Sequence, residues 1–320
     1  MTKLIIQIPC YNEAETLPAT IADLPRAIDG IDKVEILVID DGSTDQTINV
    51  ARELGVDHIV RLTHNQGLAA AFARGLEASL QMGADIIVNT DGDNQYRGDC
   101  IRDLVEPILR GNAEIVVGDR QIDTIQHFSV FKKILQKFGS WIVRWASKTD
   151  VPDATSGFRA FSKEAALRLS IFSEYTYTIE TIIQAGKKGI SITSVPVETN
   201  EVLRESRLIQ STFQYVIRSA ITIIRIFLMY EALRSFLSLG AIPLAGGFLL
   251  LLRFGYFYII GQGQGHVQSL IISSILILIA FIIFLLGFLA DLIARNRRIN
   301  EEIVYRMRKT DSAQVDSETL

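Results

Sequence analysis

Asp91 and Asp93, separated only by Gly92, are the residues of this 320-residue chain whose type and spacing best suit metal binding. Two carboxylates on one turn can converge on a hard divalent cation such as Mg²⁺ or Mn²⁺, which also takes phosphate oxygens as ligands. The glycine lets the backbone approach a ligand closely. An Asp-X-Asp pattern also occurs in ordinary surface turns, so the elements around it decide its meaning.

Four short apolar runs near the N-terminus have the length and composition of strands. They are Leu4–Ile8, Glu35–Ile39, Asp85–Asn89 and Glu114–Val117. Helical patterns separate them, which predicts βαβ units, a mostly parallel sheet and an α/β fold. Ligands of such sheets bind beyond the carboxyl ends of strands. The Asp91-Gly92-Asp93 turn and a second acidic turn, Asp40–Ser43, both follow predicted strands.

The predicted helices begin and end at residues with capping or breaking chemistry. They are Asn12 to about Ala27 with a capping box of Asn12 and Glu15, Ser43 or Thr44 to Gly55, and Gly67 to about Met82. Composition argues against nucleic acid as a partner, because the net charge is −4 and the sequence has no clustered basic motif. Cys10 and Cys100 are expected to be ordinary buried or half-buried thiols. No secretory leader precedes the first predicted strand, so we expect the N-terminal domain to stay in the cytosol.

The C-terminal part of the chain has the pattern of a membrane anchor. Two apolar runs, about 236–260 and 267–290, each exceed the roughly 20 residues that cross a bilayer, and the short polar linker 261–266 predicts a hairpin. The segment Arg207–Met229 has arginines along one side, which predicts an interfacial amphipathic helix, with a core helix as the alternative.

Basic residues flank the outer ends of the hairpin, so both termini are predicted to be cytoplasmic. Arg253 lies inside the first span, where it would snorkel to the interface or face another helix. Residues 310–320 are expected to be a disordered tail. The oligomeric state stays open, because small residues in the first span could pack between protomers of a homo-oligomer. These residues are Gly240, Ala245, Gly246 and Gly247.

Taken together, these motifs resemble the inverting glycosyltransferases of family 2, which have the GT-A fold. The matching segments are Ile8–Glu13, Val38–Asp45, Asn65–Ala71 and Asp91–Asp93. Thr155–Arg159 and Arg204–Arg207 are similar to the branch that transfers sugars to dolichyl and polyprenyl phosphates. The two-helix hairpin resembles bacterial members that load glucose or a similar sugar onto undecaprenyl phosphate, which implies a bacterial plasma membrane.

The resemblance implies a role for individual residues. The nucleotide-sugar donor, expected to be UDP-glucose, would contact Pro9, Tyr11, Asn12, Glu13, Asp40, Asp41, Gly67, Ala69, Asp91, Gly92 and Asp93. Mg²⁺ or Mn²⁺ would be held by Asp91, Asp93 and Gln95, and the acceptor phosphate by Arg120, Lys133, Arg204, Ser206 and Arg207. Asp91, Asp93 and Arg120 are the catalytic candidates. Each residue has a structural alternative: Asn12 also suits a helix cap, and Asp40 and Asp41 also suit a turn.

A lipid phosphate acceptor would simplify the chemistry, because its second pKa is near 6 and its oxygen is already anionic at neutral pH. No general base is then needed, whereas a sugar or lipid hydroxyl acceptor would need one. Asp153 and Glu180 match acidic positions of the family, and a structural role, such as pairing of Asp153 with Arg159, stays open beside a catalytic one. A catalytically inactive membrane scaffold is the non-enzymatic alternative.

The Q-x-x-R-W motif of polysaccharide synthases is missing, because Trp141 stands where its glutamine would precede Arg144-Trp145. This disfavours processive polymer synthesis. The predicted organisation has four parts: a GT-A catalytic domain at 1–205, amphipathic juxtamembrane helices at 206–234, a transmembrane hairpin at 235–291 and a cytoplasmic basic and polar tail at 292–320.

Overall fold

The protein was analysed as a computed structural model that describes residues 1–121, 130–172, 176–200, 221 and 231–318, without the side chains of 130–138 and 313–318. It divides into two compact units. One, here called the α/β unit, comprises residues 1–223 and 302–320, and the other, the hairpin unit, comprises residues 224–301. Each is described by itself.

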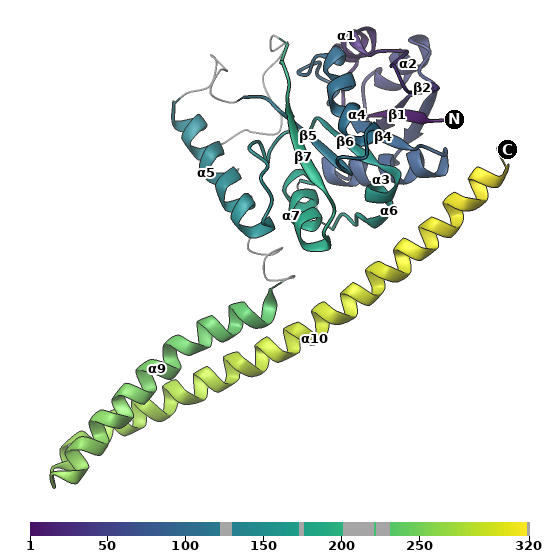
Figure 1. Cartoon of the computed structure of the whole chain (residues 1–320). Coiled ribbons are helices and arrows are strands. Elements are labelled where there is room, and N and C mark those ends of the chain that lie inside the picture. The colour runs from purple at the N-terminus through teal and green to yellow at the C-terminus, as the bar shows by residue number, and fades with distance from the viewer. Residues whose placement is uncertain (122–129, 173–175, 201–220, 222–230, 319–320) are drawn as a thin grey trace. The chain divides into compact units, whose positions relative to one another are not determined.

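The α/β unit is built on a seven-stranded sheet with the order β3-β2-β1-β4-β6-β5-β7 (Figure 1). The strands are β1 Lys3–Cys10, β2 Lys33–Asp40, β3 His58–Arg61, β4 Ile86–Asn89, β5 Ile115–Asp119, β6 Arg159–Ser162 and β7 Ile192–Pro196. All neighbouring pairs are parallel except those of β6, which is antiparallel to both β4 and β5. The predicted α/β class, the mostly parallel sheet and its four predicted strands are confirmed.

Helices cover both faces of this sheet, because alternate side chains of the central strands are apolar on both sides. The helices are α1 Leu17–Asp23, α2 Thr47–Glu53, α3 Leu68–Gln81, α4 Ile101–Leu109 with the short η1 Gly98–Cys100 before it, α5 Val130–Ser147, α6 Lys163–Arg168 and α7 Thr178–Lys188. Leu4, Ile6 and Ile8 of β1 share one core with residues of α1, α2 and α4. The opposite face meets α3, where a Cβ on Gly75 would lie only 2.4 Å from the Gln7 side chain.

Two predicted helix starts are wrong. The first helix begins at Leu17 rather than near Asn12, and the second begins at Thr47 rather than after Ser43 or Thr44. Asn12 adopts a left-handed φ of 57° and turns its side chain away from the helix, so no capping box forms. The third helix agrees with the prediction, with Gly67 as its N-cap.

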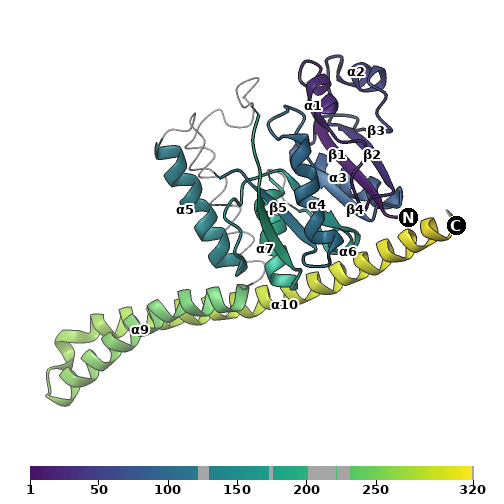
Figure 2. The ribbon, with the colours of Figure 1, turned by 45° about the horizontal axis from the view of Figure 1, so that its top comes forward.

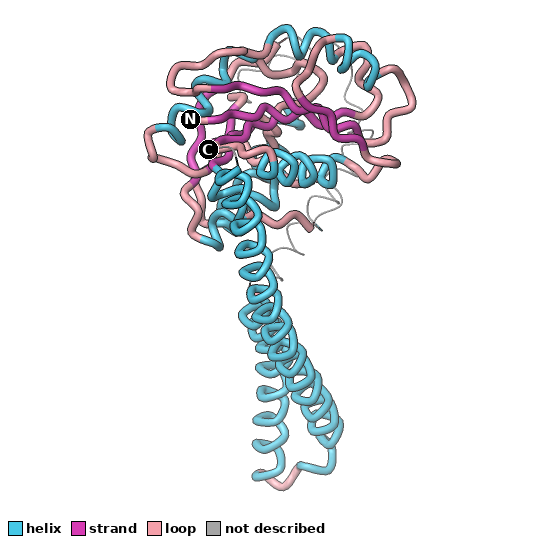
Figure 3. The backbone as a smooth tube through the Cα atoms, turned by 90° about the vertical axis from the view of Figure 1, so that its right-hand side faces the viewer, coloured by secondary structure: helices cyan, strands magenta, loops and turns pink. Residues whose placement is uncertain are grey.

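The hairpin unit contains α9 Ala232–Ile259, the short η2 Gly263–His266 and the first part of α10 Val267–Glu318 (Figure 3). Two helices, Ala232–Ile259 and Gly263–Ser312, are long and apolar enough to cross a membrane. Small residues let them approach: a Cβ on Gly240 would lie 2.5 Å from Phe284, and a Cβ on Gly247 would lie 2.9 Å from Ile277. The Ser273 hydroxyl also donates to the Gly247 carbonyl oxygen at 2.7 Å. Gly240 and Gly247 are therefore used within the hairpin.

Three expectations about the C-terminal half have different outcomes. The expected disordered tail is wrong for residues 310–318, which continue α10. The predicted interfacial helix at 207–229 lies outside the described residues except for position 221. Arg253 is exposed on α9, and its guanidinium carbon lies 5.9 Å from the centre of the Phe257 ring, one turn further on.

The aromatic packing between α3, β6 and α7 gives a test of the core. Phe72 is fully buried, its ring stacks on Tyr177 at 3.7 Å and lies 5.6 Å from Phe161. We expect Phe72→Ala to cost about 3–5 kcal/mol, which lowers the Tm by on the order of 10 °C for a unit of this size. Thermal unfolding in detergent, followed by tryptophan fluorescence, measures it, since both tryptophans lie in α5. The control Leu109→Ala, at a side chain 39% exposed, should change little, and equal losses in both variants would contradict this packing.

Candidate active site at the carboxyl edge of the sheet

The reversed direction of β6 explains how distant residues meet at one edge of the sheet. Its first residue, Arg159, pairs with Asn89, the last residue of β4, and with Val117 near the end of β5. The turn that precedes β6 therefore lies beside the residues that follow β4 and β5. This brings segments around positions 91, 120 and 155 to the same edge.

The Asp91-Gly92-Asp93 turn follows β4 and is fixed from α1. The hydroxyls of Thr16 and Thr20 donate to the Gly92 carbonyl oxygen at 2.8 and 3.1 Å. A Cβ on Gly92 would lie 3.2 Å from the Cys10 sulfur, so the turn packs tightly on the end of β1. The two aspartates are half-buried, and Asp93 accepts a hydrogen bond from the Gln95 backbone N–H at 3.1 Å.

Asp91 is the electrostatically stressed group of this turn. Burial, the neighbouring Asp93 carboxylate and, to a smaller extent, Glu13 raise the pKa of Asp91 to about 7, against the opposing effect of Arg120 and Arg159. A divalent cation would relieve the repulsion between the two carboxylates. Among the residues that the structure describes, no three His, Cys, Asp or Glu side chains gather into a metal site. Mg²⁺ is commonly bound by one or two carboxylates together with substrate phosphates, and the Asp91–Asp93 pair fits that donor set.

The ends of β1 and β2 form a second part of the site, which Asn12 ties together. Its side-chain oxygen accepts from the backbone N–H of Thr44 at 2.8 Å and of Asp45 at 3.3 Å. In return, the Asn12 backbone N–H donates to the Ser43 hydroxyl at 2.9 Å. Glu13 is held similarly, since its backbone N–H donates to the Thr47 hydroxyl at 2.8 Å. Asn12 thus shapes the second acidic turn.

Asp40 and Asp41 have different surroundings in this turn. Asp41 accepts from the backbone N–H groups of Gln66 at 2.7 Å and Gly67 at 2.9 Å, which fixes the start of α3. Burial raises the pKa of the Asp41 carboxyl, and these two hydrogen bonds oppose the effect. Asp40 is fully buried, and its Oδ1 accepts from the Ser43 N–H. Its Oδ2 has no hydrogen bond to any described residue, only an ion pair to Arg61 at 3.8 Å.

The remaining predicted donor residues lie at the same edge but differ in exposure. Tyr11 is 40% exposed, whereas Pro9 at the end of β1 and Ala69 in the first turn of α3 are buried. Gly67 has a φ of 91°, a conformation that favours glycine. Their assignment to the donor pocket stays a prediction.

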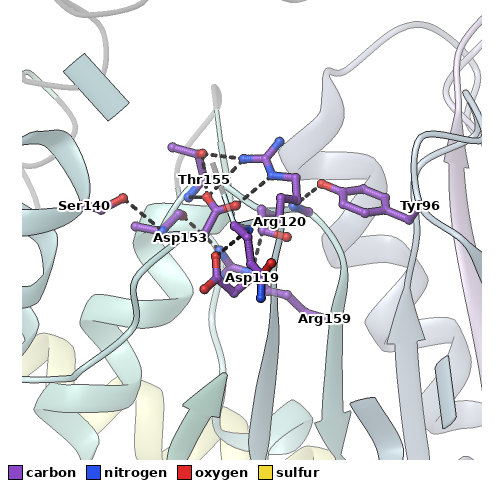
Figure 4. A network of polar contacts seen from close by, with 11 residues as sticks. Tyr96, Asp119, Arg120, Ser140, Asp153, Thr155 and Arg159 are labelled. Atoms are coloured by element: carbon purple, nitrogen blue, oxygen red, sulfur yellow. Dashed lines mark hydrogen bonds and ion pairs between the residues drawn. The ribbon is translucent and has the colours of Figure 1, made fainter. Parts of the chain in front are cut away.

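Arg120 directly follows β5 and is held in a two-pronged ion pair with Asp153 (Figure 4). Its Nε and Nη2 donate to the two carboxylate oxygens of Asp153 at 2.7 and 3.0 Å, and Nη2 also donates to the Thr155 hydroxyl at 2.8 Å. Burial would raise the pKa of Asp153, but the Arg120 guanidinium outweighs it and holds that pKa below its usual range. Arg120 is only 8% exposed, so it is a fixed cation rather than a mobile surface charge.

The turn before β6 is anchored from several elements. Asn89 donates to the Gly157 carbonyl oxygen at 2.9 Å, and the Gly157 N–H donates to the Tyr96 hydroxyl at 3.2 Å. A Cβ on Gly157 would lie 3.0 Å from Asp91 Oδ2 and from the Tyr177 hydroxyl, so no side chain fits there without displacing them. Glycine at this position therefore lets the turn lie against the Asp91 carboxylate.

Arg159 is a second buried cation beneath the site, and Asp153, for which the sequence leaves pairing with Arg159 open, pairs with Arg120 instead. Among the described residues Arg159 donates to four oxygens, none of which belongs to a carboxylate: Ser156 O, Thr178 O, Thr181 Oγ1 and Ala154 O. Burial lowers the pKa of Arg159 to about 10, which still leaves it charged at neutral pH. It braces the turn that contains Asp153 and Thr155.

The other predicted residues either have no described side chain or have a structural contact. Arg204, Ser206 and Arg207 lie outside the described residues, and Lys133 lies in α5 at a position whose side chain is not described. Glu180 is buried in α7, where it accepts hydrogen bonds from the backbone N–H of Phe172 at 3.1 and 3.2 Å. Sequence reasoning missed the part played by Thr155, Tyr96 and Asn89, although the Thr155–Arg159 motif was the available signal for the first.

Comparison with known proteins identifies the class. The model of glycosyl transferase family 2 matches residues 5–174. Polyprenol monophosphomannose synthase of Mycolicibacterium smegmatis is 27% identical over 210 residues, which cover 62% of this chain and 78% of that protein. UDP-N-acetylglucosamine–dolichyl-phosphate N-acetylglucosaminyltransferase of Methanococcus voltae is 30% identical over 216 residues, which cover 60% of this chain and 83% of that protein.

Among solved structures, glucosyl-3-phosphoglycerate synthase of Mycobacterium tuberculosis has a TM-score of 0.55 at 21% identity, covering 71% of this chain and 79% of that one. At this identity the likeness shows the fold, and that fold is of the GT-A type. The chain belongs to glycosyl transferase family 2 and is a glycosyltransferase.

The raised pKa of Asp91 predicts a pH dependence of stability in the metal-free protein. Asp91 titrates near its ordinary pKa of about 4 in the unfolded chain and at about 7 in the folded protein. Between these values the folded state binds more protons than the unfolded state, so stability falls as pH rises from about 4 to about 7. Asp91→Asn, which cannot ionise, should lose less stability over this window.

The Tm of both proteins, measured in chelator across this range, checks the prediction. Asp29→Asn is the matched control. The Asp29 carboxylate is 90% exposed, so this variant should have the same pH profile as the wild type. Indistinguishable profiles for wild type and Asp91→Asn would show that Asp91 keeps an ordinary pKa.

Proposed function

We propose that this glycosyltransferase transfers a hexose from a nucleoside diphosphate sugar to a polyprenyl phosphate, with UDP-glucose as donor and undecaprenyl phosphate as acceptor. The observation that carries the proposal is the pairing of Arg120 with Asp153 at the edge where the Asp91-Gly92-Asp93 turn lies. It puts a fixed cation for an anionic acceptor near a turn suited to a metal-bound diphosphate.

The two sequence relatives support the acceptor class, because their names specify a polyprenol and a dolichyl phosphate. The names specify different sugars, mannose in one and N-acetylglucosamine in the other. Glucose and UDP are therefore the finer part of the proposal, and they rest on the resemblance of the hairpin to bacterial glucosyltransferases.

On the donor side, the residues at the ends of β1 and β2 would hold the nucleotide. A buried polar atom is normally hydrogen-bonded, and Asp40 Oδ2 has no such bond to the described residues. An N–H of the base or an O–H of the ribose would complete it. Asn12 holds the turn in shape for this contact through Thr44 and Asp45.

Asp91 and Asp93, with Gln95, would hold Mg²⁺ or Mn²⁺ against the donor diphosphate. Such a cation supplies charge stabilisation of the departing nucleoside diphosphate when bound. The chain's own contribution is to keep the two carboxylates together. The Thr16 and Thr20 hydroxyls fix Gly92 between them, and Gly157 leaves room for the Asp91 carboxylate.

On the acceptor side, Arg120 would bind the phosphate and orient one of its oxygens toward the anomeric carbon. That oxygen attacks from the side opposite the departing diphosphate, so the configuration at the anomeric carbon inverts. Because the phosphate is already anionic, no residue has to remove a proton. Asp153 is poorly suited to be such a base, since its pairing with Arg120 lowers its pKa. This argues against a hydroxyl acceptor that relies on Asp153 as its base.

We propose a membrane location that follows from the two apolar helices. The catalytic domain at 1–205 and both termini would face the cytosol, with the segment 206–234 at the membrane surface. The hairpin at 235–291 would span the bacterial plasma membrane, and residues 292–320 would return to the cytosol. The acceptor lipid would then present its phosphate at the membrane face where the catalytic domain lies.

A donor panel tests the proposal. Purified full-length protein is incubated with undecaprenyl phosphate, Mg²⁺ or Mn²⁺ and one radiolabelled donor at a time: UDP-glucose, UDP-galactose, UDP-N-acetylglucosamine or GDP-mannose. We expect labelled lipid with UDP-glucose and none after chelation or with Asp91→Asn. Label from another donor would correct the sugar alone, whereas no labelled lipid with any donor would overturn the proposed function.

Arg120→Lys tests the acceptor site while it keeps a positive charge beside Asp153. Lysine cannot reproduce the two-pronged pairing, so we expect kcat/KM for the lipid phosphate to fall by about tenfold or more. Donor affinity, measured by titration, should stay within about twofold, or about 0.4 kcal/mol.

Arg110→Lys is the matched control, since Arg110 is a 67% exposed arginine paired with Glu106 on α4. It should change neither quantity. An equal loss of donor affinity in Arg120→Lys would remove Arg120 from the acceptor site.

A further inference from the structure

Both tryptophans of the chain lie on the exposed side of α5. Trp141 is 55% and Trp145 is 65% exposed, and the chain contains no other tryptophan. They are four residues apart, so they project from the same side of the helix, one turn from each other. Exposed apolar side chains that adjoin one another and are bordered by polar residues are typical of interaction sites.

The opposite side of α5 is fixed against the rest of the α/β unit. Val143, Ala146 and Ser147 are buried there. A Cβ on Gly186 of α7 would lie 1.8 Å from the Ser147 carbonyl oxygen, so the two helices are in direct backbone contact. The helix cannot rotate to bury its tryptophans without losing this packing. Their outward direction is therefore a property of the folded unit.

The exposed side also has basic residues. Arg144 lies between the tryptophans in sequence with its side chain 37% exposed, and its contact with the exposed Asp150 is long, at 3.8 Å. Lys148, just beyond the end of α5, is exposed. Tryptophan rings favour the boundary between headgroups and acyl chains, and basic residues beside them favour anionic lipid. No acidic membrane-repelling cluster occurs on the described part of α5.

We infer that this α5 face, defined as Trp141, Arg144, Trp145 and Lys148, docks on the surface of a bilayer that contains anionic lipid. The occupant is a lipid surface rather than another protein, because the face combines interfacial aromatic rings with positive charge in a chain with two membrane-crossing candidates. The tryptophan rings enter the headgroup boundary, and the two basic side chains contact lipid phosphates.

A hydrogen bond connects this face to the acceptor side of the site. Ser140, the residue before Trp141, accepts at its hydroxyl from the Ala154 backbone N–H at 3.2 Å (Figure 4). Ala154 lies between Asp153 and Thr155, which both bond to Arg120. The helix that docks on lipid is thus the helix that supports the turn behind the acceptor cation. This use for the docking rests on the proposed function, whereas the docking itself does not.

Tryptophan fluorescence tests the inference without donor, acceptor or turnover, so its failure is distinguishable from failure of the proposed function. Full-length protein is placed in nanodiscs of anionic and zwitterionic phospholipid, with or without bromine on the acyl chains near the headgroup. Brominated chains quench only tryptophans that lie in the bilayer boundary. We expect brominated discs to lower the fluorescence of the native protein. Trp141→Phe and Trp145→Phe each keep one tryptophan, so bromine should cause part of this loss in each variant.

A displaced tryptophan provides the matched control. Glu53 is exposed at the end of α2, which packs against β2 on the other side of the α/β unit from α5 (Figure 2). In a chain with Trp141→Phe, Trp145→Phe and Glu53→Trp, bromine should leave the fluorescence unchanged. Equal quenching there, or no quenching of the native tryptophans, would overturn the inference.

The basic residues are tested separately. Arg144→Glu combined with Lys148→Glu should reduce the bromine quenching in anionic discs and raise the KM for lipid phosphate, with donor affinity unchanged. Quenching that is insensitive to both substitutions and to lipid charge would show that the tryptophans alone hold the surface, and the charged part of the inference would be wrong.

Discussion

The need to neutralise buried charge governs the arrangement of this site. Arg120 and Arg159 are both buried near the end of β5 and the start of β6, and among the described residues only Asp153 forms an ion pair with either of them. A buried cation is costly unless it is paired or hydrogen-bonded. Asp153 and Thr155 accept hydrogen bonds from Arg120, and backbone carbonyl oxygens of the same turn and of the start of α7 accept from Arg159. Both guanidinium groups also lower the pKa of Asp91, against the opposite effects of burial and of Asp93.

Charge balance and the path of the chain are linked. The turn that satisfies both arginines can reach them only because β6 runs against its neighbours, which puts the start of that strand beside the ends of β4 and β5. With β6 parallel, Asp153 would lie at the opposite edge of the sheet and Arg120 would have no partner there. The strand reversal, the ion pair and the position of Gly157 against Asp91 therefore depend on one another.

The sequence was informative where local patterns determine structure. Short apolar runs predicted β1, β2, β4 and β5, Gly67 predicted the start of α3, and family motifs predicted the fold class. Prediction from the sequence failed where side chains form hydrogen bonds with residues distant in the chain. Asn12 has good capping chemistry, but its oxygen bonds the backbone of Thr44 and Asp45 across the sheet edge. Asp153 bonds Arg120, 33 positions earlier, rather than Arg159, six positions later. Nothing in local spacing distinguishes those alternatives.

The close packing of the hairpin unit has a mechanical consequence. Gly240, Gly247 and Gly287 each admit a large side chain of the facing helix, and the Ser273 hydroxyl bonds the Gly247 carbonyl oxygen, so one helix cannot slide along the other without breaking these contacts. The two helices of the hairpin unit are therefore held in one register. A displacement of one of them along its axis has to be followed by the other, so the pair moves as a single body.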